Sequence, residues 1–422
     1  MAERLDIFAT TTRGTEDLLA AELAELGGRR IRQDRGGVRF RANLSEALGI
    51  CLWSRIAMRI LYPLGRFEAG QTEEIYAAAM QVAWEEHLNA TSTFAVEASL
   101  RGDEQHHSGF VALKIKDAIA DRLRVRLGVR PDVDTRSPAV RVVAHLAGRA
   151  LTLSLDVCGQ PLNRRGYRVE PTMAPLKETL AAAILRAAGY SGEEPLIDPL
   201  CGSGTFLIEA AMIARRQAPN LHQRLAVERW PFLGEEARRI LRDLRLDAER
   251  QERRAPREIL GFDKEERAIQ AARRNVQAAR LTDTIRLAQG DATKLPELHA
   301  GPGLVVGNPP YGDRLRGQGQ QAMKSFYYRL GESFSGLVGW RIALLAGNPA
   351  FESAFHLRPV RRRQLFNGPI ACILLEYEPG VSRGSRGTVR KRPPAASSAR
   401  RRSVPPEGVE TQGNTPETRR GR

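Results

Sequence analysis

The stretch Asn308-Pro309-Pro310-Tyr311 carries residue types that could bind a planar amino group. It follows the apolar run 304–307, which is typical of a buried parallel strand. The two prolines fix φ and remove backbone donors, so the turn presents mainly carbonyl acceptors. The Asn308 amide oxygen is a further acceptor, and the Tyr311 ring offers a flat face for a base. An exocyclic NH2 group fits such a site, although Asn-Pro is also a common strand-ending turn.

A glycine-rich segment at residues 198–206, with the sequence DPLCGSGTF, is the second feature that could bind a ligand. It follows a predicted strand, 196–198, and precedes a helix that we expect to begin at Thr205. Glycines let the backbone approach a ligand closely, and the helix N-terminus adds free N–H groups. No Gly-Lys-Ser/Thr follows, so this is not a phosphate loop. Residue 207 is leucine, which breaks the dinucleotide fingerprint and argues against an NAD oxidoreductase.

Acidic residues follow the next two predicted strands. Asp263 ends the strand 259–263, where a carboxylate can bind ribose hydroxyls, and Asp291 follows the strand 284–287, where it could accept from an adenine amino group. Taken singly, each is more simply explained as a cap or turn residue. In this order, beside the glycine-rich turn, they predict an S-adenosylmethionine pocket at the carboxyl edge of a sheet. The candidate cofactor-binding residues are Asp198, Cys201, Gly202, Gly204, Thr205, Asp263, Asp291 and Asn308.

The four cysteines, at positions 51, 158, 201 and 372, lie far apart and form no Cys-x-x-Cys pair. This spacing argues against a zinc ribbon or a disulfide framework and is typical of a reducing cytoplasm. Cys201 could be a nucleophile, but no base neighbours it in the sequence, so a small packing residue is the simpler interpretation. No metal is expected, since His106 and His107 have no ligand partner at a useful spacing.

The 422 residues carry a net charge of +16, which suggests a polyanionic partner. Residues 381–422 hold eleven Lys/Arg and three Glu, so this tail supplies +8 and the remaining chain keeps +8. The tail has no aromatic residues, and we expect it to be disordered. No apolar run reaches the ~18 residues of a membrane span. The N-terminus has no basic-then-apolar signal sequence, and we expect a cytoplasmic protein.

Strands and helices alternate from residue 176 to 380, which predicts a mostly parallel α/β sheet with helices on both faces. Residues 218–256 form an Arg/Glu-rich helical insertion in this pattern. The expected elements are strands at 196–198, 259–263, 284–287, 304–307, 342–345 and 370–377 and helices from 205, at 264–280 and at 325–337. Two α+β units precede them, with strands at 5–10, 38–40, 93–98, 140–144 and 151–157 and helices at 15–26 and 110–127.

Three segments together resemble the class I amino-methyltransferases that carry a THUMP domain: DPLCGSGTF at 198–206, Gly290-Asp291-Ala292, and NPPYGDRL at 308–315. The linker PLNRRGYR at 161–168 is similar to the segment that joins THUMP to methyltransferase in bacterial 23S rRNA guanine-N2 methyltransferases. The resemblance implies a Rossmann-like class I methyltransferase domain preceded by ferredoxin-like and THUMP modules. Its implied boundaries are 1–45 for the ferredoxin-like segment, 46–157 for THUMP, 158–175 for the linker, 176–380 for the methyltransferase and 381–422 for the basic tail.

The same resemblance implies methyl transfer from S-adenosylmethionine to the N2 amine of a guanine in RNA, with 23S rRNA or the assembling large subunit as the expected partner. Some family members carry a second fused methyltransferase domain that makes 7-methylguanine. In this sequence the basic tail stands where that second domain would be. We therefore expect only the first methyltransferase domain, without the 7-methylguanine activity. A tRNA guanine-N2 methyltransferase and an N6-adenine methyltransferase stay open as alternatives. Another alternative is an RNA-binding protein that retains the methyltransferase fold but has no catalytic activity. The intact glycine-rich segment argues against this alternative.

Asn308, Pro309, Pro310 and Tyr311 are the expected catalytic residues. Asn308 and the Pro309 carbonyl would accept the two N–H bonds of the target amine, and Tyr311 would stack on the base. The basic linker is expected to hold the RNA backbone through Arg164, Arg165, Tyr167 and Arg168.

Overall fold

The computed structural model describes residues 4–102, 106–170, 176–295, 302–312 and 318–380. The basic tail, for which we expect disorder, lies outside these residues. Within the described ranges, no helix combines the length and the apolar character needed to cross a bilayer.

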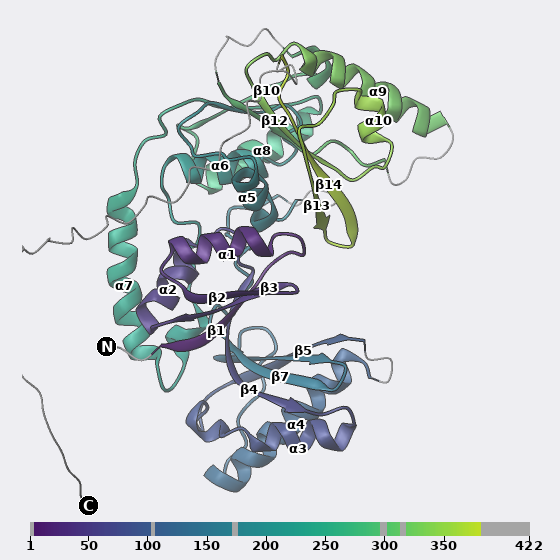
Figure 1. Ribbon diagram of the computed structural model, residues 1–422. Coiled ribbons are helices and arrows are strands. Elements are labelled where there is room, and N and C mark those ends of the chain that lie inside the picture. The colour runs from purple at the N-terminus through teal and green to yellow at the C-terminus, as the bar shows by residue number, and fades with distance from the viewer. Residues whose placement is uncertain (1–3, 103–105, 171–175, 296–301, 313–317, 381–422) are drawn as a thin grey trace, which may run out of the picture. The chain divides into compact units, whose positions relative to one another are not determined.

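The first half of the chain forms an antiparallel-rich sheet with helices (Figure 1). Its strands are β1 (Leu5–Thr10), β2 (Arg29–Asp34), β3 (Gly37–Ala42), β4 (Arg59–Glu68), β5 (Phe94–Arg101), β6 (Val140–Ala147) and β7 (Ala150–Asp156). Its helices are α1 (Glu16–Glu25), α2 (Leu44–Trp53), α3 (Thr72–Gln81) and α4 (Ser108–Leu127), with the 3₁₀ turn η1 (Trp84–Glu86).

Strand β4 joins the two N-terminal modules into one seven-stranded sheet with the order β2-β3-β1-β4-β7-β6-β5. Leu61 of β4 pairs with Phe8 of β1 on one side and with Asp156 of β7 on the other. One hydrophobic core follows the whole sheet and includes Leu48 of α2 and Ile115 of α4. The predicted boundary at residues 45–46 therefore lies inside a helix that packs in this shared core.

The second half of the chain forms the sheet that carries the candidate site. Its strands are β8 (Leu196–Asp198), β9 (Ile259–Asp263), β10 (Ile285–Gln289), β11 (Leu304–Gly307), β12 (Arg341–Ala346), β13 (Arg361–Asn367) and β14 (Ile370–Tyr377). Its helices are α5 (Glu178–Ala187), α6 (Thr205–Ala214), α7 (Gly234–Gln251), α8 (Glu266–Ala278), α9 (Gln318–Ser335) and α10 (Phe351–Phe355), with 3₁₀ turns η2 (Ala226–Arg229) and η3 (Ala292–Lys294).

This second sheet has the order β10-β9-β8-β11-β12-β14-β13, and its first five strands run parallel. Successive residues of a strand point to opposite faces, so its two faces have separate cores. Leu304 packs on the face with α5, α6 and α8, whereas Val305 packs on the face with α9 and α10. The predicted α/β sheet with helices on both faces is confirmed, and β14 and the edge strand β13 extend it by antiparallel pairing.

The apolar strands were the most predictable elements. The expected strands at 196–198, 259–263 and 304–307 have these same bounds in β8, β9 and β11. Strand β13 was not expected, because it begins with three arginines and lacks the apolar alternation of a typical strand.

Candidate functional site

The candidate site lies where four neighbouring parallel strands end. Asp198 ends β8 and pairs with Gly261, two residues before Asp263 at the end of β9. Asp291 follows β10, and Asn308 follows β11 on the other side of β8. Because parallel strands have their carboxyl ends at one edge, these four side chains share the crevice edge where α/β sheets bind ligands. The structure thus brings the predicted strand-end residues together.

The glycine-rich loop is held against the end of β9 by backbone hydrogen bonds. The Cys201 N–H donates to the Phe262 carbonyl at 2.9 Å, and the Gly202 N–H donates to Asp263 Oδ2 at 2.9 Å. Gly202 and Gly204 have φ angles of +52° and +84°, which favour glycine. The chain then enters α6 at Thr205, so the N-terminus of this helix faces the loop.

Two of the strand-end acids differ in their surroundings. Asp198 is 1% exposed, and burial raises the pKa of its carboxyl well above the ordinary value. Its Oδ1 accepts from the Leu200 N–H at 3.1 Å, and no cation of the described chain offsets the burial. Hydrogen bonds from the Thr293 N–H and hydroxyl instead lower the pKa of Asp291. Asp291 therefore caps its turn as a carboxylate.

The Cys201 thiol is unsuited to nucleophilic catalysis. It is 6% exposed, and burial raises its pKa well above the ordinary value. The neighbouring Asp198 and Asp263 raise the pKa further. Only the thiolate is an effective nucleophile, so Cys201 acts as a packing residue of the loop.

The turn after β11 is held rigid by three side chains. The Tyr311 hydroxyl donates to Asn308 Oδ1 at 2.8 Å, and the Tyr327 hydroxyl of α9 donates to the Pro310 carbonyl at 2.5 Å. Asn348 Nδ2 donates to the Tyr311 carbonyl at 2.7 Å. A carbonyl oxygen has two lone pairs, so Asn308 Oδ1 can accept one further N–H.

The Tyr311 ring is packed inside the turn. A Cβ placed on Gly347 would lie 2.6 Å from the ring atoms Cγ and Cδ2, so the Gly347 backbone covers one ring face. The Tyr311 hydroxyl also lies 3.6 Å from Cys372 Sγ. Stacking on a base, as expected from the sequence, is therefore restricted to the other face of the ring.

A cavity of about 300 Å³ lies beside this turn. Its lining includes Gly312, Met323, Tyr327, Asn348 and Pro349. Its volume is at the lower end of the ~300–1,000 Å³ usual for ligand pockets. The site thus combines hydrogen-bond acceptors at the strand end with an adjacent hollow.

Comparisons with known proteins agree with this arrangement. Residues 165–376 match the family model described as "RMKL-like, methyltransferase domain". The chain belongs to this family. Residues 69–156 match the THUMP domain, and residues 6–61 match the "RlmL ferredoxin-like domain". The fold is therefore a class I, S-adenosylmethionine-dependent methyltransferase fold behind ferredoxin-like and THUMP modules, as the sequence predicted.

Individual relatives share most of this chain. "Ribosomal RNA large subunit methyltransferase K/L" from Syntrophotalea carbinolica is 40% identical over 89% of this chain and 53% of its own length. The chain thus spans about half the length of the curated relatives it matches. The structure of SMU.472 complexed with SAH has a TM-score of 0.81 and 30% identity, covering 90% of this chain and all of that one. A structure described as a predicted N6-adenine-specific DNA methylase from Listeria monocytogenes has a TM-score of 0.78 and 27% identity, covering 89% and 96%.

The linker of this family member differs from the sequence expectation. The side chains of Arg165 and Glu209 are both fully buried and form an ion pair at 3.5 Å. Arg165 also donates to the Arg55 carbonyl at 2.6 Å, and the buried Tyr167 hydroxyl donates to Glu209 at 3.2 Å. The expectation that Arg165 and Tyr167 contact RNA is wrong, because both are enclosed and their donors are engaged.

Arg168 is also engaged within the protein. It forms an ion pair with Glu178 at 2.9 Å, and it donates to Ser203 Oγ at 3.1 Å and to Thr205 Oγ1 at 3.0 Å. It therefore braces the glycine-rich loop. Of the four linker residues, only Arg164 is exposed, and it is left as the candidate for RNA contact.

A residue that sequence reasoning missed also braces the loop. Asn275 in α8 is fully buried, donates to the Ser203 carbonyl at 3.0 Å and accepts from the Val169 N–H at 3.0 Å. The only signal in the sequence is an asparagine among the apolar positions of an amphipathic helix. Its partners, 72 and 106 residues away, meet it only in the folded chain.

We expect Arg165→Ala to reduce the free energy of unfolding by about 3–5 kcal/mol, because it leaves the Glu209 carboxylate buried without its cation. Urea unfolding of the intact chain measures this loss. Arg164→Ala is the matched control, and an exposed change of this kind should stay within about 0.5 kcal/mol. Equal effects of the two substitutions would contradict the structural role of Arg165.

Asp263→Ala should weaken S-adenosylmethionine binding at least about tenfold, because hydrogen bonds to a charged group contribute ~1.5–3 kcal/mol and the Gly202 N–H loses its acceptor. Titration calorimetry measures the affinity. Asp283→Ala removes an exposed carboxylate before β10, at the opposite edge of the sheet, and should leave the affinity unchanged. The prediction fails if both variants bind the cofactor like the parent chain.

Proposed function

We propose that this protein transfers a methyl group from S-adenosylmethionine to the exocyclic N2 amine of a guanine in RNA, with large-subunit ribosomal RNA as the substrate. The observation that carries the proposal is the rigid Asn308 turn, which ends β11 directly beside the end of β8. The turn that we assign to the target amine and the glycine-rich loop that we assign to the cofactor thus lie at the same sheet edge. The role in rRNA processing and the cytoplasmic location are parts of the same proposal.

The residues at the ends of β8 and β9 fit a cationic cofactor. Burial raises the pKa of the Asp198 carboxyl, and no cation among the described residues offsets this, so a positive ligand would favour its ionised form. We assign ribose hydroxyl binding to Asp263, adenine contact to Asp291, and backbone contacts to the loop from Cys201 to Thr205. When bound, the sulfonium supplies an electrophilic methyl group.

The Asn308 turn would orient the target amine. Its nitrogen is a poor nucleophile because the lone pair is delocalised into the ring. The free lone pair of Asn308 Oδ1 and the Pro309 carbonyl accept its two N–H bonds, which aims the nitrogen lone pair at the cofactor side. Tyr311 fixes the Asn308 side chain through its 2.8 Å hydrogen bond. Positioning of this kind can supply roughly 7–11 kcal/mol in favourable reactions.

The target guanine must leave its stack to reach this turn. The cavity beside Gly312 and Tyr327 is the space available to the flipped base. Stacking on the uncovered face of Tyr311 would add roughly 1–3 kcal/mol. No strong base is assigned, because the methylated amine is acidic and loses its proton to water.

Support for RNA comes from the THUMP match at 69–156 and from the rRNA methyltransferase names of the relatives. Two alternatives use the same chemistry. The first alternative is a guanine in tRNA, where the methylation would be the same and only the shape of the bound RNA would differ. The N6 amine of adenine would also suit the Asn308 turn, and one similar structure is described as an adenine-specific DNA methylase.

The deciding experiment identifies the methylated nucleoside. The full chain is incubated with labelled S-adenosylmethionine and with unmodified 23S rRNA, tRNA or duplex DNA, and the products are digested. We expect label in N2-methylguanosine from 23S rRNA. Label in N6-methyladenine, or in tRNA alone, would replace this proposal with the corresponding alternative.

We expect Asn308→Ala to retain cofactor affinity and to lose turnover by about 10²-fold or more, because one acceptor of the amine disappears. Asn308→Asp keeps an oxygen acceptor at this position and should retain more activity than Asn308→Ala. Calorimetry and single-turnover methylation measure the two effects separately. Unchanged turnover in Asn308→Ala would refute the acceptor role.

A further inference from the structure

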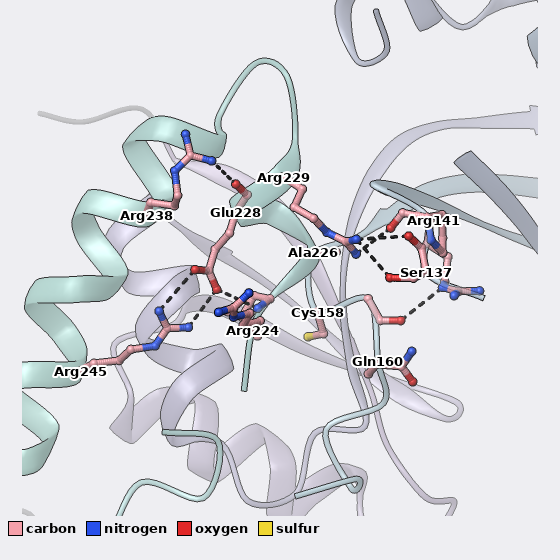
Figure 2. A pocket seen from close by; sticks show the side chains of 13 residues that line it. Ser137, Arg141, Cys158, Gln160, Arg224, Ala226, Glu228, Arg229, Arg238 and Arg245 are labelled. Atoms are coloured by element: carbon pink, nitrogen blue, oxygen red, sulfur yellow. Dashed lines mark hydrogen bonds and ion pairs between the residues drawn. The ribbon is translucent and has the colours of Figure 1, made fainter. Parts of the chain in front are cut away.

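A basic cavity of about 690 Å³ shares no lining residue with the hollow beside the Asn308 turn. Figure 2 shows the side chains that line it. Three separate segments of the sequence form it. Ser137, Pro138 and Arg141 come from the THUMP part, residues 158–160 from the linker, and residues 224–245 from the insertion that contains η2 and α7. The cavity is therefore formed by the THUMP part, the linker and the segment inserted in the methyltransferase domain.

The lining of this cavity is strongly positive. It contains one carboxylate, Glu228, and five guanidinium groups, which gives a formal charge of +4. The arginines are Arg141, Arg224, Arg229, Arg238 and Arg245. Glu97, outside the lining, pairs with Arg141, and Glu228 pairs with Arg245. The other three guanidinium groups leave an excess of positive charge around the hollow, so an anion inside it would be stabilised.

Three of these arginines hold the cavity walls in place. Arg229 donates to the Ser137 carbonyl at 3.1 Å and to the Pro138 carbonyl at 2.7 Å, which ties η2 to the THUMP part. Arg245 donates to Glu228 Oε1 at 2.9 Å and so ties α7 to η2. Arg141 pairs with Glu97 and donates to the Gly159 carbonyl at 3.2 Å. The walls are therefore preorganised before any ligand arrives.

The other two arginines are available to a ligand. Arg224 is exposed and has no hydrogen bond or ion pair with any described residue. Arg238 is exposed and makes a single recorded hydrogen bond, to the Glu228 carbonyl, so most of its donors are unused. At the linker side, the Gln160 amide oxygen accepts from the exposed Arg164 at 3.2 Å, which extends the basic surface beyond the cavity.

We propose that this cavity binds backbone phosphates of the RNA substrate, at a distance from the methylated base. Arginine presents a planar fork of donors that matches phosphate oxygens, and phosphate contacts position a nucleic acid without reading its sequence. Arg224 and Arg238 contact the phosphates, whereas Arg141, Arg229 and Arg245 shape the site. The inference rests on the proposed RNA substrate, and it adds a second contact that anchors this RNA.

The test compares two double variants of the full chain. Arg224→Ala/Arg238→Ala removes the two available guanidinium groups of the cavity. Arg239→Ala/Arg250→Ala removes the same charge from exposed positions of α7 outside the cavity lining. The affinity for unmodified 23S rRNA is measured at several salt concentrations, with S-adenosylmethionine affinity and unfolding midpoint as checks on the fold.

We expect the cavity variant to bind this RNA about tenfold more weakly. Each lost phosphate contact reduces the magnitude of the negative slope of log K against log[salt] by about 0.7–0.9, so the magnitude should fall by about 1.5. In methylation assays its KM should rise while kcat stays unchanged. The control variant should change RNA affinity less than about twofold.

The inference is overturned if the salt slope of the cavity variant equals that of the parent chain, or if the control variant loses as much affinity. In a competition experiment, polyglutamate could displace the bound RNA at a lower concentration than competing RNA does. That result would indicate an acidic protein partner and would also overturn the inference. Failure of the proposed function is distinguishable, because it appears as a different methylated nucleoside made by the parent chain. The RNA-binding difference between the two variants does not depend on which nucleoside that is.

Discussion

The buried ion pair between Arg165 and Glu209 is the interaction on which the arrangement of this molecule depends. Arg165 belongs to the linker, and Glu209 lies one turn inside α6, the helix that begins at the cofactor loop. Arg165 also binds the carbonyl of Arg55, which follows α2 in the N-terminal sheet. Two charges in a dry interior require each other, because either one alone has a large desolvation cost. The pair thus fixes the linker against both halves of the chain.

The glycine-rich loop is held by contacts from several surrounding elements. Arg168 contacts the side chains of Ser203 and Thr205, Asn275 holds the Ser203 carbonyl, and Asp263 holds the Gly202 N–H. Every contact comes from a different element of the chain. A rigid loop places the helix N-terminus and the strand-end carboxylates at constant distances, which is what a methyl donor needs if it is to face the Asn308 turn.

A second feature of the fold is that the Asn308 turn and the basic cavity share no lining residue, so the two proposed roles, methyl transfer and RNA anchoring, fall on different parts of the chain. The Asn308 turn offers few acceptors and one small hollow, which suits a single base. The basic cavity is large, polar and distant in the sequence from that turn, and it is formed by the THUMP part together with the insertion. Part of the positive charge of the chain is thus concentrated around a cavity with defined walls, which is the place where we propose that RNA phosphates bind.

The parts of the site that could be predicted from the sequence are those that depend on the pattern of apolar and turn-forming residues over a short stretch of chain. Apolar runs fixed the bounds of β8, β9 and β11, and the order of the strand-end acids followed from the parallel topology that those runs imply. The basic residues of the linker could not be assigned in this way. Composition indicated that Arg165 and Arg168 were candidates for RNA contact, yet both guanidinium groups bind carboxylates inside the protein.

The sequence by itself determined which residue types stand at the strand ends, because strand burial and turn chemistry act over a few neighbouring residues. It also determined the net positive charge and the family resemblance. Only the tertiary structure decided which arginines face solvent, that Tyr311 is packed against Gly347 while holding Asn308, and that residues 137–141 meet residues 224–245 around one cavity. These outcomes depend on contacts between residues far apart in the chain, where burial and partner geometry determine what a charged or aromatic side chain can do.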